Sequence, residues 1–234
     1  MRKSVVVTGC SKGLGRHLTE SLIANGYAVI GISRTKPSSF DENFTHYVCD
    51  LSDSVSVVET ANSIQKEFKS IYALVNNAAN GTDGLLPTQH NSEISQILQT
   101  NLLAPILLAK YFSRSMLLQR DGRIINISSV VASTGYRGLS VYAASKGGLV
   151  SFSRSLARDL GPANITVNAI LPGFMESEMT SGISKEKFEK IRARSPLNSL
   201  AEFKDISEMV LYLLSENASK ITGTTLTIDA GNSA

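Results

Sequence analysis

Val5-Val-Val-Thr8-Gly9-Cys-Ser-Lys12-Gly13-Leu-Gly15 is the stretch of this chain that decides its fold. It opens with a run of β-branched residues, which is typical of a strand buried in a parallel sheet. The glycines after it let the backbone turn tightly and approach a pyrophosphate, which the amino terminus of a following helix attracts. Their spacing is Gly-xxx-Gly-x-Gly, which differs from the ordinary Gly-x-Gly-xx-Gly fingerprint. We therefore predict a phosphate-binding turn here; a tight turn without a ligand is the alternative.

The rest of the chain repeats this alternation of strand and helix. Helical periodicity is present at residues 14–25, 55–69, 93–118, 141–160 and 205–215, and Pro105 predicts a break or kink in the third of these segments. Strands are expected at residues 4–8, 28–33, 46–50, 72–76, 123–128, 165–171 and 225–229. Such alternation indicates βαβ units. The predicted fold class is α/β: a doubly wound Rossmann fold whose seven-stranded, mostly parallel sheet carries helices on both faces, in a single domain over residues 1–234.

Composition excludes several classes of protein. The 234 residues are 42% hydrophobic and 18% charged, as in an ordinary globular protein. A net charge of +3 without a basic block argues against a nucleic-acid partner. The longest apolar run, residues 102–109, is far shorter than the roughly 20 residues of a membrane span. The first predicted strand leaves no room for a signal peptide, so we expect a cytoplasmic protein with no membrane partner. Neither the two cysteines nor the three histidines have metal-ligand spacing, and no metal site is expected.

Tyr142 and Lys146 are four residues apart and share one face of a predicted helix. A tyrosine hydroxyl has an ordinary pKa of about 10, and a nearby ammonium lowers that pKa. A pKa of roughly 7 requires about 4 kcal/mol, more than one exposed charge supplies. A partly dry site with a second positive group, such as an oxidised nicotinamide ring, would supply it. The alternative is a pair of surface side chains with exposed polar ends.

The end of the second predicted strand gives evidence about the cofactor. An NAD site usually carries an acidic residue there for the ribose 2′-hydroxyl, but this chain has Ile32-Ser33-Arg34-Thr35. Arg34 and Lys12 are placed to bind a 2′-phosphate, for which a guanidinium is well shaped. We therefore predict NADP(H) as the cofactor; two solvated surface cations are the alternative.

Several further motifs follow in a fixed order. After Thr8-Gly9-xxx-Gly13-x-Gly15 come Asp50-Leu51, Asn76-Asn-Ala-Ala79, Asn101, Ser129, Tyr142-xxx-Lys146 and Pro172-Gly173. By this set the whole chain resembles a short-chain dehydrogenase/reductase of the single-domain kind, and most of all the 3-oxoacyl-[acyl-carrier-protein] reductases. It departs from that family at Ala79, where a glycine is usual. The resemblance implies an NADP-dependent oxidoreductase of fatty acid biosynthesis or a related pathway.

The resemblance also assigns residues to the cofactor. Asp50 would take the adenine amino group with Leu51 beside the ring, Asn77 and Ala78 would line the adenosine ribose, and Ser177 replaces a common threonine at the carboxamide end. The full expected set is Gly9, Ser11, Lys12, Gly13, Leu14, Gly15, Ser33, Arg34, Thr35, Asp50, Leu51, Asn77, Ala78, Ala79, Tyr142, Lys146, Pro172, Gly173, Met175 and Ser177.

Four residues form the expected catalytic set. Ser129, which the family's spacing to Tyr142 selects over Ser128, would hydrogen-bond the substrate carbonyl oxygen. Tyr142 would protonate the developing alkoxide as hydride arrives from the nicotinamide, while Lys146 lowers the pKa of the tyrosine and fixes the ribose. Asn101 would support a water chain to Lys146. An asparagine within a helix is unfavourable without a polar role of this kind.

The substrate and the partners follow less directly from the sequence. In the acyl-carrier-protein reductases two arginines near the mouth of the active site meet the carrier; Arg120 stands at the first position and Ala163 at the second. A further departure is Ser199, where an arginine is typical. The segment at about 174–198 is expected to be a substrate lid over the crevice, with a surface helix pair as the alternative. A 3-oxoacyl thioester or a related keto compound is the expected substrate.

The helices at residues 102–118 and 141–160 are apolar on more than one face. The family pairs such helices between subunits, so a homotetramer is expected; burial within one subunit is the alternative. Two alternatives to the predicted function stay open at this point. One is a reductase or dehydrogenase of a specialised metabolite or sugar pathway. The other is a non-catalytic dinucleotide-sensing module, which would have no need of the complete set of four catalytic residues.

Overall fold

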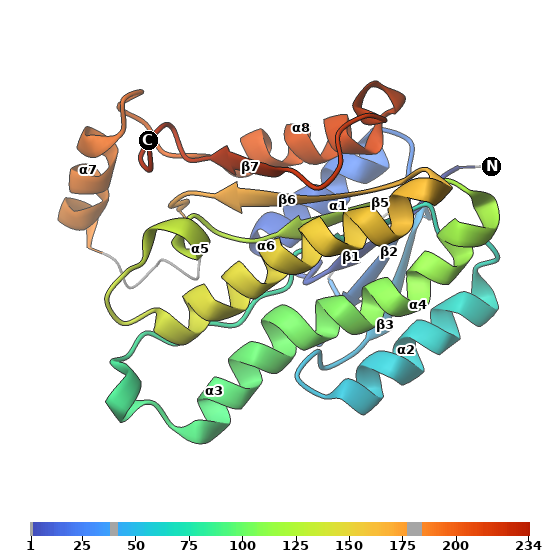
Figure 1. Cartoon of the computed structure of the whole chain (residues 1–234), viewed down its shortest axis with the longest axis horizontal. Helices are drawn as coiled ribbons and strands as arrows, with labels where there is room; N and C mark the ends of the chain where they lie inside the picture. Colours follow the sequence, from blue (N-terminus) through green and yellow to red (C-terminus); the bar gives the residue numbers. More distant parts are fainter. Residues whose placement is uncertain (1, 38–41, 177–183) are drawn as a thin grey trace.

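A seven-stranded sheet forms the centre of the protein (Figure 1). The computed structural model describes residues 2–37, 42–176 and 184–234. The strand order is β3-β2-β1-β4-β5-β6-β7, and every pair of neighbouring strands among the described residues is parallel. The strands are β1 (Ser4–Thr8), β2 (Ala28–Ser33), β3 (Phe44–Val48), β4 (Ala73–Asn76), β5 (Gly122–Ile127), β6 (Ile165–Pro172) and β7 (Thr225–Ile228). The predicted fold class is confirmed.

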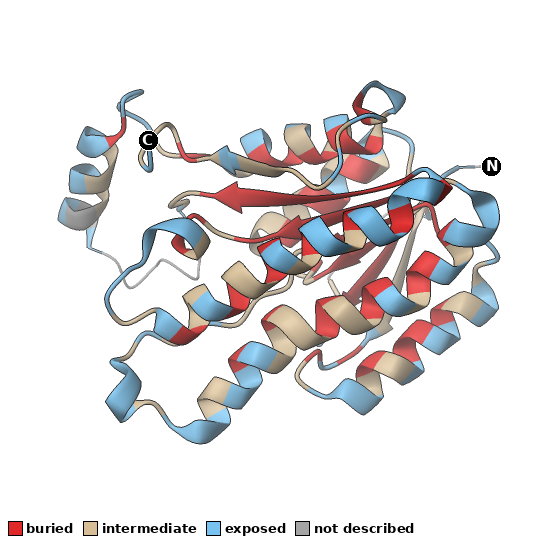
Figure 2. Ribbon diagram, viewed as in Figure 1, coloured by how far each residue is buried: buried red, intermediate tan, exposed pale blue. Residues whose placement is uncertain are grey.

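Helices cover both faces of the sheet because each inner strand is apolar on both sides. The helices α2 (Ser54–Glu67), α4 (Ala104–Gln119) and α6 (Ser140–Leu160) pack on one face, and α1 (Gly13–Ala24) and α8 (Phe203–Leu214) pack on the other. Figure 2 shows the buried residues concentrated in the central strands and on the inner sides of these helices. The sheet is therefore a rigid base whose strand ends hold the site.

The third predicted helix differs most from the expectation. Residues 93–118 form α3 (Asn91–Leu98), a π-helical turn η2 (Gln99–Leu103) and α4, which follow one another directly. Pro105 lies in the first turn of α4, and its missing N–H and its ring disfavour a regular α-helical turn immediately before it. The disruption is thus the π-helical turn before the proline, and it contains Asn101.

Smaller elements complete the described chain. They are η1 (Leu86–Thr88), α5 (Val131–Thr134), η3 (Gly161–Ala163), α7 (Lys185–Arg194) and η5 (Glu216–Ala218). The sequence analysis did not predict α5. It also placed the third strand two residues late, because Phe44 and Thr45 pair with β2 ahead of His46.

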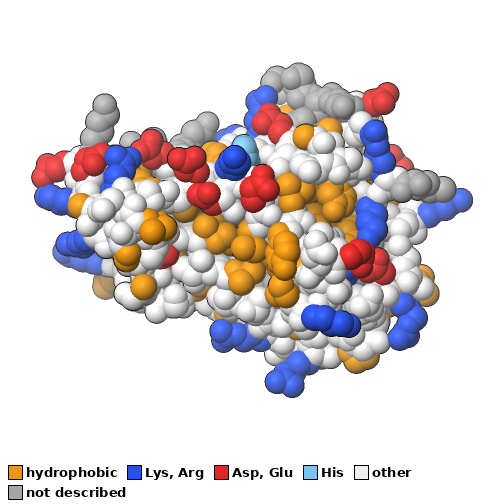
Figure 3. All heavy atoms as spheres, turned by 90° about the horizontal axis from the view of Figure 1, so that it is seen from above, with side chains coloured by type: hydrophobic (Ala, Val, Ile, Leu, Met, Phe, Trp, Pro, Cys, Tyr) orange, Lys and Arg blue, Asp and Glu red, His pale blue; other side chains and the backbone are white. Residues whose placement is uncertain are grey.

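The strand β7 is one edge of the sheet and pairs only with β6 among the described strands. Figure 3 looks onto the side of the molecule where β7 and α8 lie, and hydrophobic side chains gather near the middle of this face with charged side chains around them. Tyr212 of α8 is among the exposed large hydrophobic residues. No helix in the described part of the chain is long and apolar enough to cross a membrane.

Candidate active site

The candidate site lies at the edge of the sheet where the strands end. Because all strands are parallel, the residues after β1, β4, β5 and β6 meet there. In the sheet β2 lies on one side of β1 and β4 on the other, so the strand order reverses at β1. Folds of this kind bind ligands at the carboxyl ends of the strands at such a switch point. Most of the residues selected from the sequence follow these four strands.

The turn after β1 is shaped to leave its backbone open. Gly9 and Gly13 have φ angles of +71° and +53°, and α1 begins at Gly13. A Cβ atom on Gly15 would lie 2.0 Å from the carbonyl oxygen of Gly9, so only glycine fits at this position. Thr8 Oγ1 accepts hydrogen bonds from the backbone N–H groups of Asn77 and Ala78, each at 3.0 Å. The turn and the segment after β4 therefore form one cradle, which suits a pyrophosphate at the start of α1.

The end of β2 presents positive charge at this edge. Arg34 and Thr35 are exposed, as is Lys12, which is the N-cap residue of α1. The hydroxyl of Ser33 is buried and donates to the carbonyl oxygen of Thr35 at 2.9 Å, so this predicted contact would be made by the backbone of Ser33. Among the described residues of this turn no carboxylate takes the place of an NAD-type acid.

Asp50 and Leu51 follow β3 as the sequence predicted. The Asp50 carboxylate accepts hydrogen bonds from the Ser52 backbone at 2.9 Å and from the Ser52 hydroxyl at 2.8 Å. These two bonds, and to a smaller degree the charge of Arg34, lower the pKa of Asp50. The carboxylate is therefore ionised and fixed at the surface, while Leu51 is buried.

Tyr142 and Lys146 lie on the first turns of α6, at the ends of β5 and β6. The Lys146 side chain is buried, its Nζ donates to the carbonyl oxygen of Ile127 at 2.8 Å, and Nζ lies 5.7 Å from the centroid of the Tyr142 ring. Burial lowers the pKa of Lys146 to about 8. Burial also raises the pKa of Tyr142 to about 12, and the hydrogen bond with Ser129 opposes that rise. Without a further positive group, Tyr142 is thus a protonated acid at neutral pH, and Lys146 alone does not lower its pKa below the ordinary value.

The two serines after β5 have different partners. Ser129 is the side-chain hydrogen-bonding partner that opposes the rise in the pKa of Tyr142, and its Oγ also accepts from the Val131 backbone N–H at 3.4 Å. Ser128 is buried and donates to the backbone carbonyl oxygen of Lys146 at 3.0 Å. The structure therefore brings Ser129, and not Ser128, together with Tyr142.

Asn101 joins three segments of the site. Its Oδ1 accepts from the Asn80 backbone N–H at 2.8 Å, and its Nδ2 donates to the Asn80 carbonyl oxygen at 2.8 Å and to the Ser145 hydroxyl at 3.1 Å. The Ser145 hydroxyl donates to the carbonyl oxygen of Tyr142 at 2.7 Å. The side chain of Asn101 thus fixes the loop after β4 against the first turns of α6.

Three further residues of the site, Thr8, Asn80 and Ser145, were not predicted from the sequence. Thr8 and Ser145 lie inside predicted motifs, next to residues that were selected. For Thr8 the available signal was its position at the end of a strand, before a glycine turn. For Ser145 it was its position next to Lys146. Nothing in the sequence alone marks the backbone of Asn80 as the partner of Asn101.

The segment after β6 is described in part. Pro172 ends β6 and Gly173 follows it, with the Gly173 N–H donating to the Ile228 carbonyl oxygen at 2.8 Å. Phe174 packs against the ring of Tyr136 with centroids 5.5 Å apart, and Met175 is half-buried. The predicted carboxamide contact of Ser177 lies outside the described residues.

The helix α7 stands beyond the carboxyl ends of β6 and β7, at the far left of Figure 1. Arg192 binds Glu189 of the same helix at 2.9 Å and lies 3.7 Å from Glu176. The Asn232 side chain donates to the Ile191 carbonyl oxygen at 3.1 Å. The described part of the predicted lid is therefore one helix at the expected edge of the sheet.

Arg120 lies at the edge of the sheet opposite to the candidate site. It follows α4 in a left-handed conformation, immediately before β5, and donates to the Pro162 carbonyl oxygen at 3.0 Å. Ser129 stands past the other end of β5, a strand about 20 Å long. Within one chain Arg120 and Ser129 therefore lie at opposite edges of the parallel sheet, and contact of Arg120 with a carrier stays a prediction.

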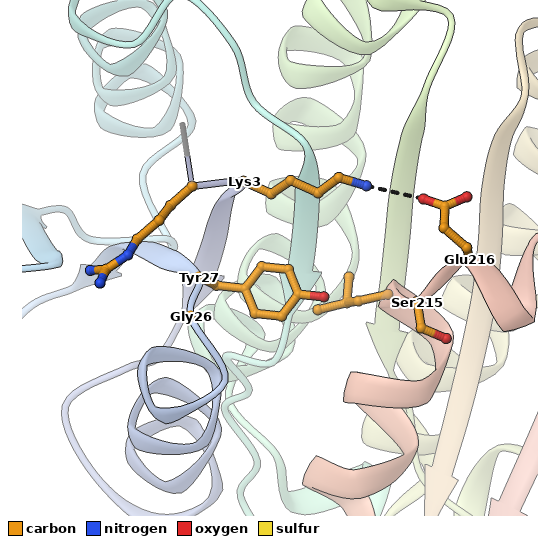
Figure 4. A pocket seen from close by; sticks show the side chains of 7 residues that line it. Lys3, Gly26, Tyr27, Ser215 and Glu216 are labelled. Atoms are coloured by element: carbon orange, nitrogen blue, oxygen red, sulfur yellow. Dashed lines mark hydrogen bonds and ion pairs between the residues drawn. The ribbon is translucent and has the colours of Figure 1, made fainter.

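A pocket of about 400 Å³ lies at the same far edge, where β1 begins (Figure 4). Lys3 Nζ donates to Glu216 Oε1 across it at 3.1 Å and lies 3.8 Å from the centroid of the Tyr72 ring. Tyr27 also lines the pocket. None of the predicted catalytic residues lines it, and its ion pair connects Lys3, just before β1, to Glu216 at the start of η5.

Comparisons with known proteins agree with this geometry. The family model described as Enoyl-(Acyl carrier protein) reductase matches residues 9–233. The chain is 38% identical to the 3-oxoacyl-[acyl-carrier-protein] reductase FabG of Salmonella typhimurium, over 98% of this chain and 96% of that protein. The Escherichia coli FabG is 37% identical with the same coverage. Among solved structures, the ligand-free aldohexose dehydrogenase of Thermoplasma acidophilum matches with a TM-score of 0.91 and 30% identity, over 99% of this chain and 94% of the other.

These relatives are matched over nearly their whole length, and their fold is that of the sheet and helices described above. The chain belongs to the short-chain dehydrogenase/reductase family and is an oxidoreductase similar to the 3-oxoacyl-[acyl-carrier-protein] reductases.

Proposed function

We propose that this protein reduces a keto group to a secondary alcohol with NADPH, and that Tyr142 donates the proton. The observation that carries the proposal is the position of the half-buried Tyr142 beside the buried Lys146, with Ser129 as the side-chain hydrogen-bonding partner of the tyrosine. When bound, the nicotinamide supplies the hydride. The residues of the chain bind and orient the carbonyl group, exclude water and move the proton.

Ser129 and Tyr142 would share the substrate carbonyl oxygen. Both hydroxyl groups are donors, and together they would stabilise the negative charge that develops on that oxygen. With its pKa raised to about 12, Tyr142 holds its proton until an alkoxide of higher basicity forms next to it. Lys146 would then stabilise the phenolate, and Asn101 would support the water chain that returns the proton.

The preference for NADPH is supported by charge. Arg34, Thr35 and Lys12 are exposed where an adenosine 2′-phosphate would lie, and an arginine fork suits that group. The turn of Gly9, Gly13 and Gly15 lies at the amino terminus of α1, which would attract the pyrophosphate. We assign the rest of the dinucleotide to the residues expected from the sequence, with the backbone of Ser33 in place of its hydroxyl.

A 3-oxoacyl thioester is the substrate that the similarity to FabG favours. A second candidate, a sugar, is favoured by two observations. The aldohexose dehydrogenase has nearly the same structure. Ala163 and Ser199 also stand where the acyl-carrier-protein reductases carry arginines. The aromatic pair of Tyr136 and Phe174, with α7 as a lid, would border the substrate in either case.

We further propose a homotetramer, in which α4 and α6 pair between subunits and the β7 edge packs against a second copy. Each chain then buries the apolar surface of β7 and α8 seen in Figure 3. Light scattering of the purified protein would test this assembly.

One screen tests the function. NADPH oxidation is measured with acetoacetyl thioesters, keto sugars and small ketones, and thermal stabilisation by NADPH is compared with that by NADH. We expect turnover of a thioester and a larger thermal shift with NADPH. Turnover of sugars alone would favour the second candidate. Equal thermal shifts would contradict the NADPH preference, and no turnover on any class would indicate a non-catalytic dinucleotide-binding module.

A further inference from the structure

Three polar side chains meet at the carboxyl end of β2 and take no part in the chemistry described above. Ser33 Oγ lies 2.8 Å from Nε2 of His46 on β3 and 3.3 Å from Sγ of Cys10 in the phosphate-binding turn. The same hydroxyl donates to the Thr35 carbonyl oxygen at 2.9 Å. Since Ser33 and Thr35 flank Arg34, this network holds the residue that would meet a 2′-phosphate.

Ser33 has one hydroxyl hydrogen and three hydrogen-bonding partners, so it donates to one of them and accepts from the other two. A carbonyl oxygen can only accept, so the hydrogen of Ser33 points to Thr35. The Nε2 of His46 must therefore donate to Ser33 Oγ, which makes the neutral imidazole the Nε2–H tautomer. Burial raises the pKa of the Cys10 thiol, so the thiol also stays a donor. Ser33 thus uses its whole hydrogen-bonding capacity within the protein.

The strands leave room for this arrangement. Gly31 pairs with His46 in the register of β2 and β3. A Cβ on Gly31 would lie 2.6 Å from Cys10 Sγ and from the Phe44 ring, and the Phe44 and His46 rings are 6.1 Å apart. A larger residue at Gly31 would displace the groups that surround the imidazole.

The charges around His46 are mostly positive. Arg34 and Lys36 follow β2, Lys12 precedes α1, and Asp50 follows β3 with its carboxylate held by Ser52. Burial, and then the charge of Lys36, lower the pKa of the half-buried His46. A phosphate dianion bound among these cations would raise the pKa of His46, because a nearby negative charge favours the imidazolium ion.

We propose that His46 is a positioning residue of the cofactor site, which holds the Ser33–Thr35 turn and in its protonated form adds a positive charge for the 2′-phosphate. This inference rests on the proposed preference for NADPH. It implies that phosphate binding takes up a proton at His46. Relative to a variant that cannot titrate at this position, the affinity for NADPH should then rise as the pH falls through the range in which His46 is protonated, while the affinity for NADH should show no such difference.

Two substitutions separate the two parts of this role. His46→Gln keeps an N–H donor for Ser33 but cannot titrate, whereas His46→Val fits a strand and removes the donor. Calorimetric titration would give the dissociation constants of NADPH and NADH for the wild type and both variants, at about pH 8 and about pH 6, around the ordinary histidine pKa. NADH binding and thermal unfolding report whether each variant is folded.

We expect His46→Val to lose about fivefold in NADPH affinity, as for one lost hydrogen bond, with NADH affinity within about twofold. The NADPH affinity of His46→Gln should equal that of the wild type at about pH 8 and be about threefold lower than that of the wild type at about pH 6. The 2′-phosphate itself titrates near pH 6, and the ratio of wild type to His46→Gln cancels that effect.

Identical pH profiles of the wild type and His46→Gln would overturn the proposal. Equal losses of NADPH and NADH affinity in His46→Val would also overturn it, since they would indicate a general structural role. A wild-type protein that binds both cofactors equally would instead contradict the NADPH preference on which the inference rests.

Discussion

Ser128 and Ser129 are adjacent and chemically identical, yet their hydroxyl groups have different surroundings. Ser129 hydrogen-bonds Tyr142, and Ser128 donates to the backbone of α6 at Lys146. We expect Ser129→Ala to lower kcat by about 100-fold, as for removal of one donor from an oxyanion site. Ser128→Ala should lower stability by about 1 kcal/mol and change kcat much less.

Steady-state kinetics and thermal unfolding of both variants would check this pair. Equal losses of kcat in the two variants would remove the assignment of Ser129. The Ser128 variant is a matched control because it makes the same chemical change one residue away.

Lys146 makes the stability of the cofactor-free protein depend on pH. Its pKa is about 8 in the folded protein, below its ordinary value of 10.5. Between these values the unfolded chain binds more protons than the folded one, so this group adds stability as the pH rises from about 8 to about 10. Relative to Lys146→Met, the wild type should therefore gain unfolding free energy over this range. Chemical denaturation at several pH values would measure the difference, and a constant difference would contradict a buried, titrating Lys146.

Residue identities predict part of the site and leave the rest open. The shared helix face of Tyr142 and Lys146 could be predicted because helical spacing is a local property, whereas the choice of Ser129 over Ser128 came from the resemblance to the family. The pKa of Tyr142 could not, since it depends on how deeply several elements bury the hydroxyl. The hydrogen bond between the Ser33 hydroxyl and His46 could not be predicted either, because His46 lies on another strand.

At the scale of elements, the π-helical turn η2 places Asn101 between the loop after β4 and α6. Its side chain satisfies both backbone groups of Asn80 and also Ser145. Asn101→Ala should lower the unfolding free energy by about 2–3 kcal/mol, because it leaves buried polar groups without partners. The half-buried neighbour Thr100, changed to Ala, should lower it by less than about 1 kcal/mol and serves as the control.

Denaturant unfolding of these two variants measures that difference directly. Equal stabilities of Asn101→Ala and Thr100→Ala would show that the hydrogen bonds of the Asn101 side chain contribute nothing to the stability of the fold. The sequence predicts an interruption of this helix from Pro105, and the π-helical turn lies in the turn directly before that proline. The sequence does not predict that this interruption is a π-helical turn.

At the scale of the whole molecule, the carboxyl and amino ends of the strands hold different groups of residues. The carboxyl edge gathers the candidate catalytic and cofactor residues, and the amino edge holds Lys3, Glu216 and the buried Arg123 in an ion-pair cluster. The alternation of strands and helices predicts this division, because a parallel sheet sends every strand end to one edge. It does not predict which surfaces meet other subunits or a carrier protein.

Arg120 tests the carrier hypothesis at this scale, since within one chain it lies at the amino edge. A carrier that contacts Arg120 would have to reach an active site of another subunit. Arg120→Glu should then raise KM for a carrier-bound substrate by about tenfold and leave a small thioester within about twofold. Lys204→Glu, an exposed charge reversal on α8, is the control. Similar effects on both substrates would rule out docking at Arg120.

The central claim is that Tyr142 donates the proton in an NADPH-dependent carbonyl reduction, and Tyr142→Phe tests it most directly. The measurement is turnover of a 3-oxoacyl thioester, with the NADPH dissociation constant determined on the same preparation. We expect an NADPH affinity within about threefold of the wild type and a kcat at least about 100-fold lower. A Phe variant that binds NADPH and turns over at close to the wild-type rate would contradict the claim.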